Sequence, residues 1–468
     1  MHHRPMRRPR HARNPVTARL QSLLGHALPG AGRGHPGPLD PFFKLAIVVA
    51  LIAAIAVPMH LGLSPFLIRF DRLLALPALS SVLVISAALL LVYTALSVVF
   101  SLLYRPTAPG PTDALPRCTV IVPAYNEGPM VGVALGSILV GDYPRDRLEI
   151  LAIDDGSTDD TWLHIQRIAR EHPDIVRAIR MPRNGGKREA LREGFKAATG
   201  EIVVTVDSDS RLDPDALRQI VAPLLADDRV AAVAGKVLVL NRYTSILTRL
   251  LAIRFFLAFD LGRAAQSRFG AVLCCPGALT AYRRGAVLAV LDRWSTATFL
   301  GEPCTIGEDR ALTTWLLRTG NRAVYQSTAI VHTLVPTHYA GLARMFLRWE
   351  RGNIREALTL LPVLATRWRR EDRWWPTFDV LLELLQFPLT CIVLVLTLAH
   401  LLTTPVDILR LVATVAMFAL LQSLYTLRSE RSTDFLYGVG YAFFAFVCLQ
   451  WIYPYSLVTV RNGRWMTR

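Results

Sequence analysis

The chain has 468 residues, of which 52% are hydrophobic and only 19% are charged, and its formal net charge at pH 7 is +16. So apolar a composition, with a mean hydropathy of +0.34, excludes an ordinary soluble protein and indicates an integral membrane protein. The basic residues gather near the N-terminus and beside apolar segments, and no nucleic-acid-binding module is visible. They therefore indicate contact with anionic lipid on the cytoplasmic side of the membrane rather than binding of nucleic acid.

The N-terminal region predicts a tail followed by membrane anchors. Residues 1–41 are rich in Arg, His, Pro and Gly, a composition that predicts a disordered basic tail. The first apolar run lies too far from Met1 for a cleaved signal peptide, so we expect it to be retained. Two runs, 43–63 and 76–103, are each long enough for the roughly 20 residues that a bilayer core requires. They form a predicted transmembrane unit over 42–104 that returns the chain to the cytoplasm.

The central block, 105–338, alternates strand-like apolar runs with amphipathic helical stretches, as expected for a parallel sheet flanked by helices. Three predicted strands, 118–123, 148–153 and 200–206, each end at a polar cluster. The carboxyl ends of strands line the ligand crevice of an open parallel sheet, so these clusters should converge at one site. The three clusters are Asn126-Glu127, Asp154-Asp155 and Asp207-Ser208-Asp209.

Asp207 and Asp209 lie two residues apart at a strand end and therefore on one face of the chain. Such a pair can present carboxylate oxygens to Mg²⁺ or Mn²⁺ bridging a diphosphate, and the metal would neutralise charge on a leaving nucleoside diphosphate. A solvated surface turn is the alternative interpretation of this acidic run. The run 154–161 is open to a similar alternative, because Asp, Ser and Thr before a helix are common N-caps.

Two further motifs carry charge that could act on a phosphorylated substrate. Two glycines precede Lys187 and Arg188, a pattern that allows close backbone approach and directs a cation at a phosphate. The spacing is not that of a P-loop, which disfavours an ATPase. Glu308 and Asp309 open a predicted helix over 311–318, where a carboxylate is either a helix cap or a general base; taken alone, the pattern favours the cap.

The region 339–378 is predicted to lie at the membrane interface. Arg344, Arg348, Arg351 and Arg355 are spaced at i, i+4, i+7 and i+11, which places them on one face of a helix. This pattern predicts an amphipathic helix whose arginines reach lipid headgroups. The basic and aromatic run that follows predicts an interface belt.

The C-terminal region, 379–468, contains three more apolar runs, about 380–402, 408–427 and 435–460. Each is long enough to span a bilayer. Three spans would place the basic C-terminal end outside, against the positive-inside tendency. A re-entrant segment in place of one span is therefore an alternative.

Together these motifs resemble the processive, membrane-embedded branch of glycosyltransferase family 2, which includes hyaluronan synthases, chitin-oligosaccharide synthases and cellulose-synthase-like enzymes. The resemblance covers about 118–356 and the layout of the flanking spans. The strings that carry it are Val122 to Glu127, Asp154 to Thr161, Asn184 to Leu191, Asp207 to Ser210, Arg263 to Ser267 with Phe269-Gly270, Gly307 to Arg310, and Arg348-Trp349.

The resemblance implies an α/β GT-A (Rossmann-like) cytoplasmic domain combined with an α-helical transmembrane domain of about five spans plus interfacial helices, in the plasma or inner membrane. It implies an inverting enzyme that uses a UDP-sugar and Mg²⁺ or Mn²⁺ to elongate a β-linked polysaccharide and to translocate the product. Two alternatives remain open. One is the transfer of a single sugar to a membrane lipid such as polyprenyl phosphate, and the other is a non-enzymatic nucleotide-sensing membrane protein or transporter.

The resemblance also assigns roles to the matching residues. Asp309, with Glu308 beside it, would be the base that deprotonates the acceptor, Arg348 would stabilise the departing diphosphate, and Trp349 would stack on the acceptor sugar. Asp207 and Asp209 would hold the metal. The predicted donor-binding residues are Ala124, Tyr125, Glu127, Asp154, Asp155, Lys187, Asp207, Ser208 and Arg351.

The chain departs from the family pattern in two places. Met345 stands where the family's Gln-x-x-Arg-Trp motif has its glutamine, which weakens the case for processivity more than the case for transfer. Cys274 to Leu279 reads Cys-Cys-Pro-Gly-Ala-Leu where relatives carry Cys-x-Ser-Gly-Pro-Leu. This second change alters the expected acceptor wall.

Overall fold

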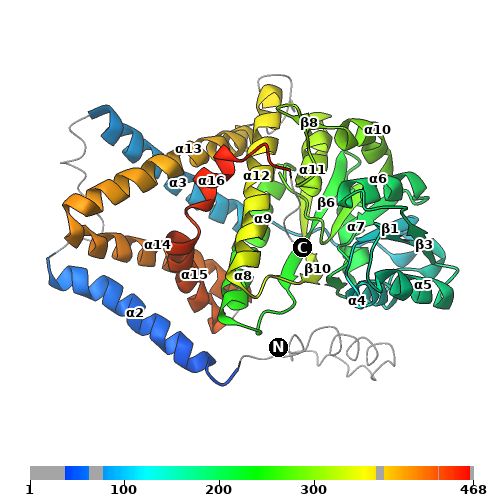
Figure 1. Cartoon of the computed structure of the whole chain (residues 1–468), viewed down its shortest axis with the longest axis horizontal. Helices are drawn as coiled ribbons and strands as arrows, with labels where there is room; N and C mark the ends of the chain where they lie inside the picture. Colours follow the sequence, from blue (N-terminus) through cyan, green and yellow to red (C-terminus); the bar gives the residue numbers. More distant parts are fainter. Residues whose placement is uncertain (1–36, 63–76, 365–373, 431, 464–468) are drawn as a thin grey trace, which may run out of the picture.

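The computed structural model describes residues 37–62, 77–364, 374–430 and 432–463. The predicted basic tail lies outside the described residues, apart from 37–41. Figure 1 shows two parts side by side, an α/β part and a set of long helices that extend away from it.

An eight-stranded sheet with the order β3-β2-β1-β4-β7-β6-β10-β5 forms the centre of the α/β part. The three strands predicted from the sequence are confirmed as β1, β2 and β4. The strands of this sheet are β1 Cys118–Ala124, β2 Leu148–Asp154, β3 Val176–Arg180, β4 Ile202–Thr205, β5 Ser210–Leu212, β6 Val230–Val239, β7 Thr280–Arg283 and β10 Arg322–Thr333. A separate hairpin pairs β8 Thr298–Phe299 with β9 Glu302–Pro303.

The prediction of an all-parallel sheet is wrong for two strands. β7 runs antiparallel between β4 and β6, and β5 runs antiparallel to β10. The loop 206–209 leads into β5 and the loop 274–279 leads into β7. Both loops lie at the carboxyl edge of the parallel strands, so the strand that follows each loop runs back through the sheet in the opposite direction. This arrangement places two loops at the edge where the polar clusters lie.

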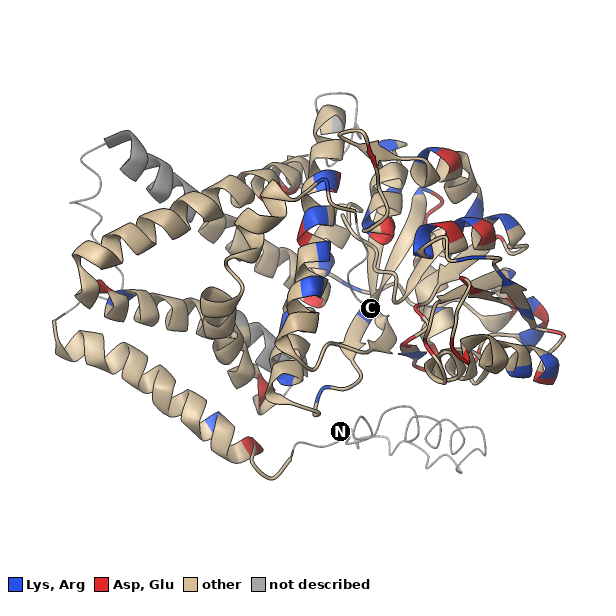
Figure 2. Cartoon of the chain, in the orientation of Figure 1, with Lys and Arg blue, Asp and Glu red and all other residues tan. Residues whose placement is uncertain are grey.

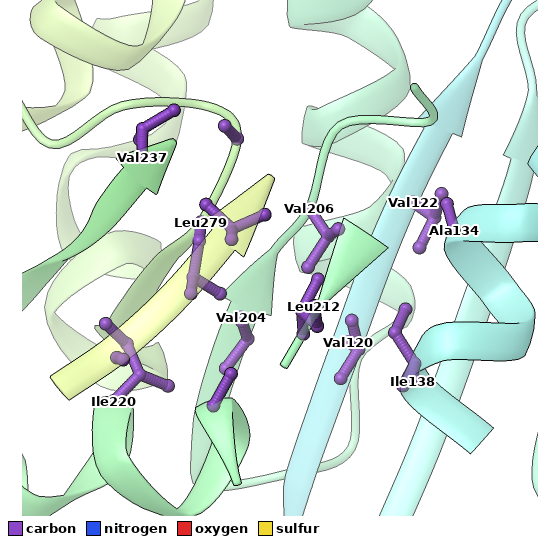
Figure 3. Packing of buried hydrophobic residues seen from close by; sticks show 14 of the residues in the cluster. Val120, Val122, Ala134, Ile138, Val204, Val206, Leu212, Ile220, Val237 and Leu279 are labelled. Atoms are coloured by element: carbon purple, nitrogen blue, oxygen red, sulfur yellow. The ribbon is translucent and has the colours of Figure 1, made fainter. Parts of the chain in front are cut away.

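Each face of the sheet has its own helices and its own core, because side chains alternate between the faces of a strand. On β1, Val120 and Val122 pack in one core and Ile121 packs in the other. Figure 3 shows the first core, with Val120 and Val122 beside Ala134 and Ile138 of α4. The helices of this face are α4 Met130–Leu139, α5 Thr161–Glu171 and α7 Ala216–Ala226. Those of the other face are α6 Lys187–Ala197, α10 Arg284–Ser295 and α11 Glu308–Arg318.

The helices between the sheet and the apolar part are α8 Ile246–Phe256, a π-helix at Leu257–Leu261, α9 Gly262–Ser267 and α12 Tyr339–Leu364. The apolar part contains α2 Asp40–His60, α3 Pro77–Leu103, α13 Trp374–Thr403, α14 Ile408–Glu430, α15 Leu436–Cys448 and α16 Ile452–Val458. Short 3₁₀ turns lie at Thr112–Ala114, Arg145–Arg147, Pro405–Asp407 and Thr433–Phe435.

Among the described residues, α2 and α13 are long and apolar enough to cross a membrane, and only 6% and 11% of their most apolar windows are buried. α15 and α16 meet at a bend of 49° and would count as a third span, or as a re-entrant loop. Figure 2 shows charged residues spread over the α/β part, whereas the long apolar helices carry few, near their ends. The structure therefore supports two or three of the five predicted spans, and the others stay predictions.

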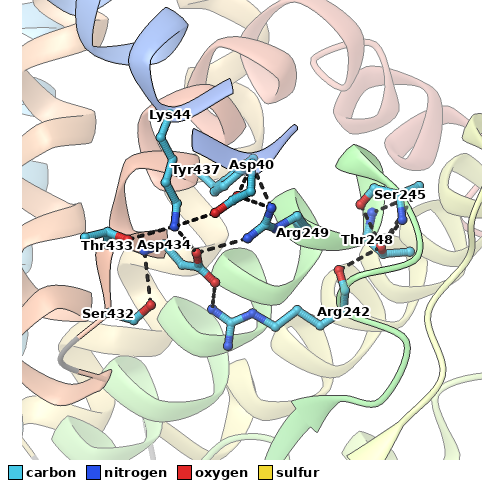
Figure 4. A network of polar contacts seen from close by, with 10 residues as sticks. All are labelled: Asp40, Lys44, Arg242, Ser245, Thr248, Arg249, Ser432, Thr433, Asp434 and Tyr437. Atoms are coloured by element: carbon cyan, nitrogen blue, oxygen red, sulfur yellow. Dashed lines mark hydrogen bonds and ion pairs between the residues drawn. The ribbon is translucent and has the colours of Figure 1, made fainter. Parts of the chain in front are cut away.

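A buried polar network fastens the first apolar helix to the last ones and to α8 (Figure 4). Asp434 accepts ion pairs from Lys44 at 2.8 Å, Arg242 at 2.6 Å and Arg249 at 3.1 Å. Asp40 pairs with Lys44 and Arg249 and accepts a hydrogen bond from Tyr437 at 2.8 Å. Two carboxylates thus hold three cations, and the network joins three separate segments of the chain.

Replacing Asp434 by alanine should destabilise the protein by about 3 kcal/mol, because three largely buried cations would keep only one carboxylate. The measurement is thermal unfolding of the full chain in nanodiscs. Asp228→Ala is the matched control, since the Asp228 side chain is 99% exposed and its contact with Arg283 is 3.6 Å long, so its loss should cost little. Equal unfolding temperatures for the two variants would contradict the role given to the network.

Candidate active site

The loops that follow β1 and β2 are joined to each other at the carboxyl edge of the sheet. Asn126 follows β1 with a φ of 53°, a left-handed conformation that asparagine tolerates better than most residues. Its N–H donates to Ser157 Oγ at 3.0 Å, and its side-chain oxygen accepts the N–H of Thr158 at 2.9 Å. The two polar clusters therefore lie together, as the strand pattern predicts.

The two aspartates after β2 are both buried and both fix neighbouring loops. Asp154 Oδ1 accepts the N–H of Ser157 at 3.1 Å, and its Oδ2 lies 3.2 Å from Arg180 Nε. Asp155 Oδ1 accepts the N–H of Gly185 at 2.7 Å. Burial raises the pKa of Asp155, although the N–H groups of Gly185 and Gly186 oppose that shift. Asp155 thus positions the glycine turn that leads directly into Lys187.

Lys187 is the first residue of α6 and bridges two carboxylates from distant segments. Its ammonium lies 2.5 Å from Asp207 Oδ1 and 3.0 Å from Glu308 Oε1. Burial lowers the pKa of Lys187, but the charges of Asp207, Glu308 and Asp309 outweigh that effect and raise it overall. The ammonium therefore keeps its proton and presents a fixed positive charge at the sheet edge.

The acidic pair after β4 fits a divalent cation that is shared with a substrate. Asp207 and Asp209 both line the same cavity, and Asp209 accepts a hydrogen bond from Thr333 at 3.3 Å. Ser208, between them, is buried and is not among the residues that line this cavity. The described residues contain no group of three His, Cys, Asp or Glu that could hold a metal unaided. Two carboxylates completed by phosphate oxygens and water are, however, a common arrangement for Mg²⁺.

Glu308 and Asp309 form the first turn of α11, and their carboxylates have different surroundings. The N-cap position is Gly307 in a left-handed conformation, so the prediction that a carboxylate caps this helix is wrong. Asp309 accepts the N–H of Gly277 at 3.1 Å and that of Arg310 at 2.7 Å. A Cβ on Gly277 would lie 2.6 Å from Lys187 Nζ, so a larger residue here would displace the ammonium from its present position.

The same surroundings push the pKa values of the two carboxyl groups apart. Burial and the charge of Glu308 raise the pKa of Asp309. Burial also opposes ionisation of Glu308, but the charges of Lys187 and Arg348 outweigh it and lower the pKa of Glu308. A buried carboxylate with a raised pKa is suited to accept a proton, whereas its neighbour stays ionised against the cations.

The motif resemblance predicts that Asp309 is the base and acts only when deprotonated, so the pH dependence of kcat/KM should follow Asp309. Activity should be lost as the pH falls through the raised pKa of Asp309, so the acid limb should lie above the ordinary range of an aspartate. Glu308→Gln removes one charge that raises this pKa and should move the acid limb to lower pH. A limb that stays in place or moves upward in Glu308→Gln would contradict the assignment of the base.

A cavity of about 750 Å³ joins this site to the apolar helices. The charged residues at the sheet edge line one end of it, and side chains of α3, α13, α14 and α15 line the other. The residues that mark the two ends are Lys187, Asp207 and Asp309 at the first, and Tyr93, Gln386, Ser423 and Tyr441 at the second.

Arg348 and Trp349 on α12 also line this cavity. Trp349 packs against Phe255 at 5.6 Å, Phe259 at 6.0 Å and Phe346 at 5.5 Å between ring centroids. Its ring is thereby held at the cavity wall. An indole at a cavity wall is a common platform for an apolar sugar face.

The prediction that four arginines of α12 reach lipid headgroups is wrong for two of them. Arg351 and Arg355 are buried; Arg351 Nη2 donates to Thr459 Oγ1 at 2.8 Å, and Arg355 Nη2 donates to the carbonyl of Ile306 at 3.0 Å. Arg344 is exposed. The inner part of the arginine face packs on α11 and α16 instead of lipid, because α12 is covered on both sides by protein.

Several predicted donor-binding residues are not among the residues that line the cavity. These residues are Ala124, Tyr125, Glu127, Asp154, Asp155, Ser208 and Arg351. Their role in donor binding stays a prediction. The structure adds cavity residues that the sequence motifs did not mark as functional. They are Arg263, Gln266, Gly277, Asp379 and Glu383. Only Arg263, Gln266 and Gly277 lie in strings that the sequence singled out.

This geometry agrees with what the chain is similar to. Residues 116–352 match the family model described as glycosyltransferase like family 2. An N-acetylglucosaminyltransferase of Azorhizobium caulinodans is 34% identical over 369 residues, which cover 76% of this chain and 89% of that protein.

The chain belongs to glycosyltransferase family 2.

Family 2 membership confirms the resemblance seen in the motifs and shows that the protein is an enzyme, which sets aside the non-enzymatic alternative. A hyaluronan synthase of Streptococcus pyogenes is 30% identical over 444 residues, covering 91% of this chain and 98% of that protein. Among solved structures, a mannosyltransferase from Pyrobaculum calidifontis in complex with GDP-Man and Mn²⁺ has a TM-score of 0.53 at 24% identity, covering 81% of this chain and 98% of that one. This likeness shows the fold, and the GT-A-like α/β domain that the sequence predicts is confirmed.

Proposed function

We propose that this family 2 enzyme transfers N-acetylglucosamine from its UDP-linked form to the end of a growing β-linked glycan. Transfer inverts the anomeric carbon, and the glycan is lengthened repeatedly on the cytoplasmic face and passed across the membrane. The observation that carries the proposal is the continuous cavity that joins the carboxylates and Lys187 to Trp349 and then to the apolar helices.

The choice of N-acetylglucosamine is supported by the name of the relative from Azorhizobium caulinodans, which matches most of this chain. The UDP carrier follows from the family resemblance. The loops after β1 and β2 would hold the uridine through Asp154 or Asp155, with Ala124, Tyr125, Glu127 and Ser208 around it.

The transfer step requires a base, a charge to stabilise the leaving group and an oriented acceptor. Asp309 accepts the proton of the acceptor hydroxyl as its oxygen forms a bond to the anomeric carbon. The bond from that carbon to the diphosphate oxygen breaks on the opposite side, and UDP leaves with the electron pair. Lys187 and Arg348 lie where they can stabilise the charge on the departing diphosphate. Glu308 stays ionised and holds Lys187 in place.

Asp207 and Asp209 would bind Mg²⁺ or Mn²⁺ together with the donor phosphates, and the bound ion would supply positive charge against the diphosphate. Asp207 now pairs with Lys187 at 2.5 Å. Donor binding therefore has to exchange part of this ion pair for contacts to phosphate.

Repeated transfer is supported by the place of the acceptor platform. Trp349 lines the same cavity as the carboxylates and as residues of the apolar helices, so a lengthened glycan can move from the platform towards these helices. Met345, at the position of the family glutamine, is buried and lines the cavity as well. A contact that the amide would make is replaced here by an apolar one.

The test uses the purified full-length protein in nanodiscs with individual UDP-sugars and Mg²⁺ or Mn²⁺. We expect UDP release to be fastest with UDP-N-acetylglucosamine and to be absent in Asp309→Asn. No release from any UDP-sugar with either ion would contradict the proposal. Release that yields only a lipid-extractable product with one added sugar would favour the single-transfer alternative.

A further inference from the structure

Part of the cavity wall is formed by the π-helix that joins α8 to α9. This turn at Leu257–Leu261 has i→i+5 hydrogen bonds in place of the i→i+4 bonds of an α-helix, a feature that recurs at functional sites. On the side of the sheet, the buried Asp260 accepts a hydrogen bond from Tyr325 at 2.8 Å and pairs with Lys236 at 3.2 Å. The π-turn is thus anchored to β10 and β6.

Phe259 of the π-turn and Arg263 of the adjoining α9 line the cavity. The Arg263 guanidinium lies 4.1 Å from the centre of the Phe259 ring, and this ring meets Trp349 edge-on with centroids 6.0 Å apart. Trp349, Phe259 and Arg263 therefore form one continuous row along the wall, which we call the acceptor row.

Arg263 is buried, and one of its terminal nitrogens lacks a partner. Only 5% of Arg263 is exposed, and its Nη1 has no hydrogen-bond partner among the described residues. In Arg310, which also lines the cavity, the Nε has no partner but both terminal nitrogens donate, to Asn353 at 2.7 Å and to Glu383 at 2.6 Å. A buried guanidinium N–H without a partner is costly unless something else supplies an oxygen.

Arg263 lines the same cavity as Asp309 and Cys274. A glycan that stacks on Trp349 with its terminal hydroxyl at Asp309 would extend along this row.

We propose that Arg263 is an acceptor-binding residue, whose guanidinium donates hydrogen bonds to oxygen atoms of the glycan behind the sugar that stacks on Trp349. The proposal rests on the proposed function and names the part of the site that holds the acceptor. The planar guanidinium can donate to hydroxyl, amide carbonyl or carboxylate oxygens, and its contact with the Phe259 ring holds it at the wall. Donor binding, on the side of Lys187 and Asp207, should not depend on Arg263.

The experiment compares Arg263→Gln with Arg268→Gln in the full-length protein in nanodiscs. Arg268 directly follows the same helix but is exposed and lies outside the cavity lining, so it is a matched loss of charge. The readouts are KM for a β-linked tetramer of N-acetylglucosamine, KM for the donor, and UDP release without acceptor. We expect Arg263→Gln to raise the acceptor KM by about tenfold or more, as for a lost hydrogen bond to a charged group, and to leave the other two values unchanged. Arg268→Gln should match the unmodified protein.

Arg263→Lys keeps the charge but loses the planar fork, so it should raise the acceptor KM by less than Arg263→Gln does. It also tests the proposal if Arg263→Gln does not fold. An unchanged acceptor KM in the arginine variants, or a donor KM that rises equally, would overturn the proposal. If the unmodified protein releases no UDP, the proposed function fails instead. The acceptor site is then tested separately, by measuring direct binding of the tetramer to the unmodified protein and to Arg263→Lys. Equal affinities would overturn it.

Discussion

Replacing Asp309 by asparagine is expected to lower sugar transfer by about 10³-fold, in the range that a positioned general base contributes. Asparagine has nearly the same shape and can still accept the N–H of Gly277, but it cannot take the proton of the acceptor hydroxyl. The fold and the donor site should therefore survive. The measurement is sugar incorporation at saturating donor and acceptor, with donor affinity measured separately.

Asp292→Asn is the control for Asp309→Asn. Asp292 lies exposed on α10, so the same change of a carboxylate to an amide should leave transfer unaffected. Transfer at an undiminished rate in Asp309→Asn would remove the base from the mechanism. A large loss of donor affinity in that variant would point to a structural role instead.

Replacing Asp207 by asparagine should lower kcat/KM by about 10²-fold or more, because the site would lose a carboxylate for the divalent ion and a partner of Lys187. The concentration of Mn²⁺ needed for half-maximal activity should rise. Chelation by EDTA should abolish the activity of the unmodified protein, and added Mn²⁺ should restore it. Asp209→Asn should act in the same direction.

The control for Asp207→Asn is Asp213→Asn, which follows β5 in the same part of the chain. Asp213 pairs with His332 at 3.1 Å on a partly exposed surface, so its loss should not alter the requirement for metal. An identical Mn²⁺ dependence in Asp207→Asn and the unmodified protein would exclude Asp207 as a metal ligand. Full activity in EDTA would exclude the metal itself.

The convergence of the polar clusters could be predicted from the sequence because it depends on a local signal. β1, β2 and β4 are short apolar runs, each followed by a polar cluster, and parallel strands must bring these ends to one edge. The family motifs then predicted that Asp309, at the start of a helix, belongs to the same site. The Lys187 ammonium contacts both Asp207 and Glu308, as expected if the three motifs meet at one site.

The direction of β5 and β7 could not be predicted in the same way. Both are very short, Ser210–Leu212 and Thr280–Arg283, and a short strand has the same apolar pattern in either direction. Their direction is set by where the preceding loop lies in the folded chain. Gly277, whose backbone N–H binds Asp309, owes its place at the site to this reversal.

The surroundings of the arginines of α12 could not be predicted from the sequence either. Helical spacing correctly places Arg348, Arg351 and Arg355 along one side of α12, but spacing alone does not reveal what covers it. Thr459 and the carbonyl of Ile306, which bind Arg351 and Arg355, are distant in sequence. Lipid headgroups and buried protein acceptors satisfy a guanidinium equally well, so the sequence pattern cannot separate them.

The length of the product made by the purified protein tests the central claim most directly. The full chain in nanodiscs would be given UDP-N-acetylglucosamine and Mn²⁺ with an excess of acceptor, and the products would be sized while most acceptor is still unused. We predict glycans lengthened by many sugars beside unreacted acceptor, and no product with Asp309→Asn. Products with a single added sugar, or no transfer at all, would contradict an enzyme that elongates a glycan through this cavity.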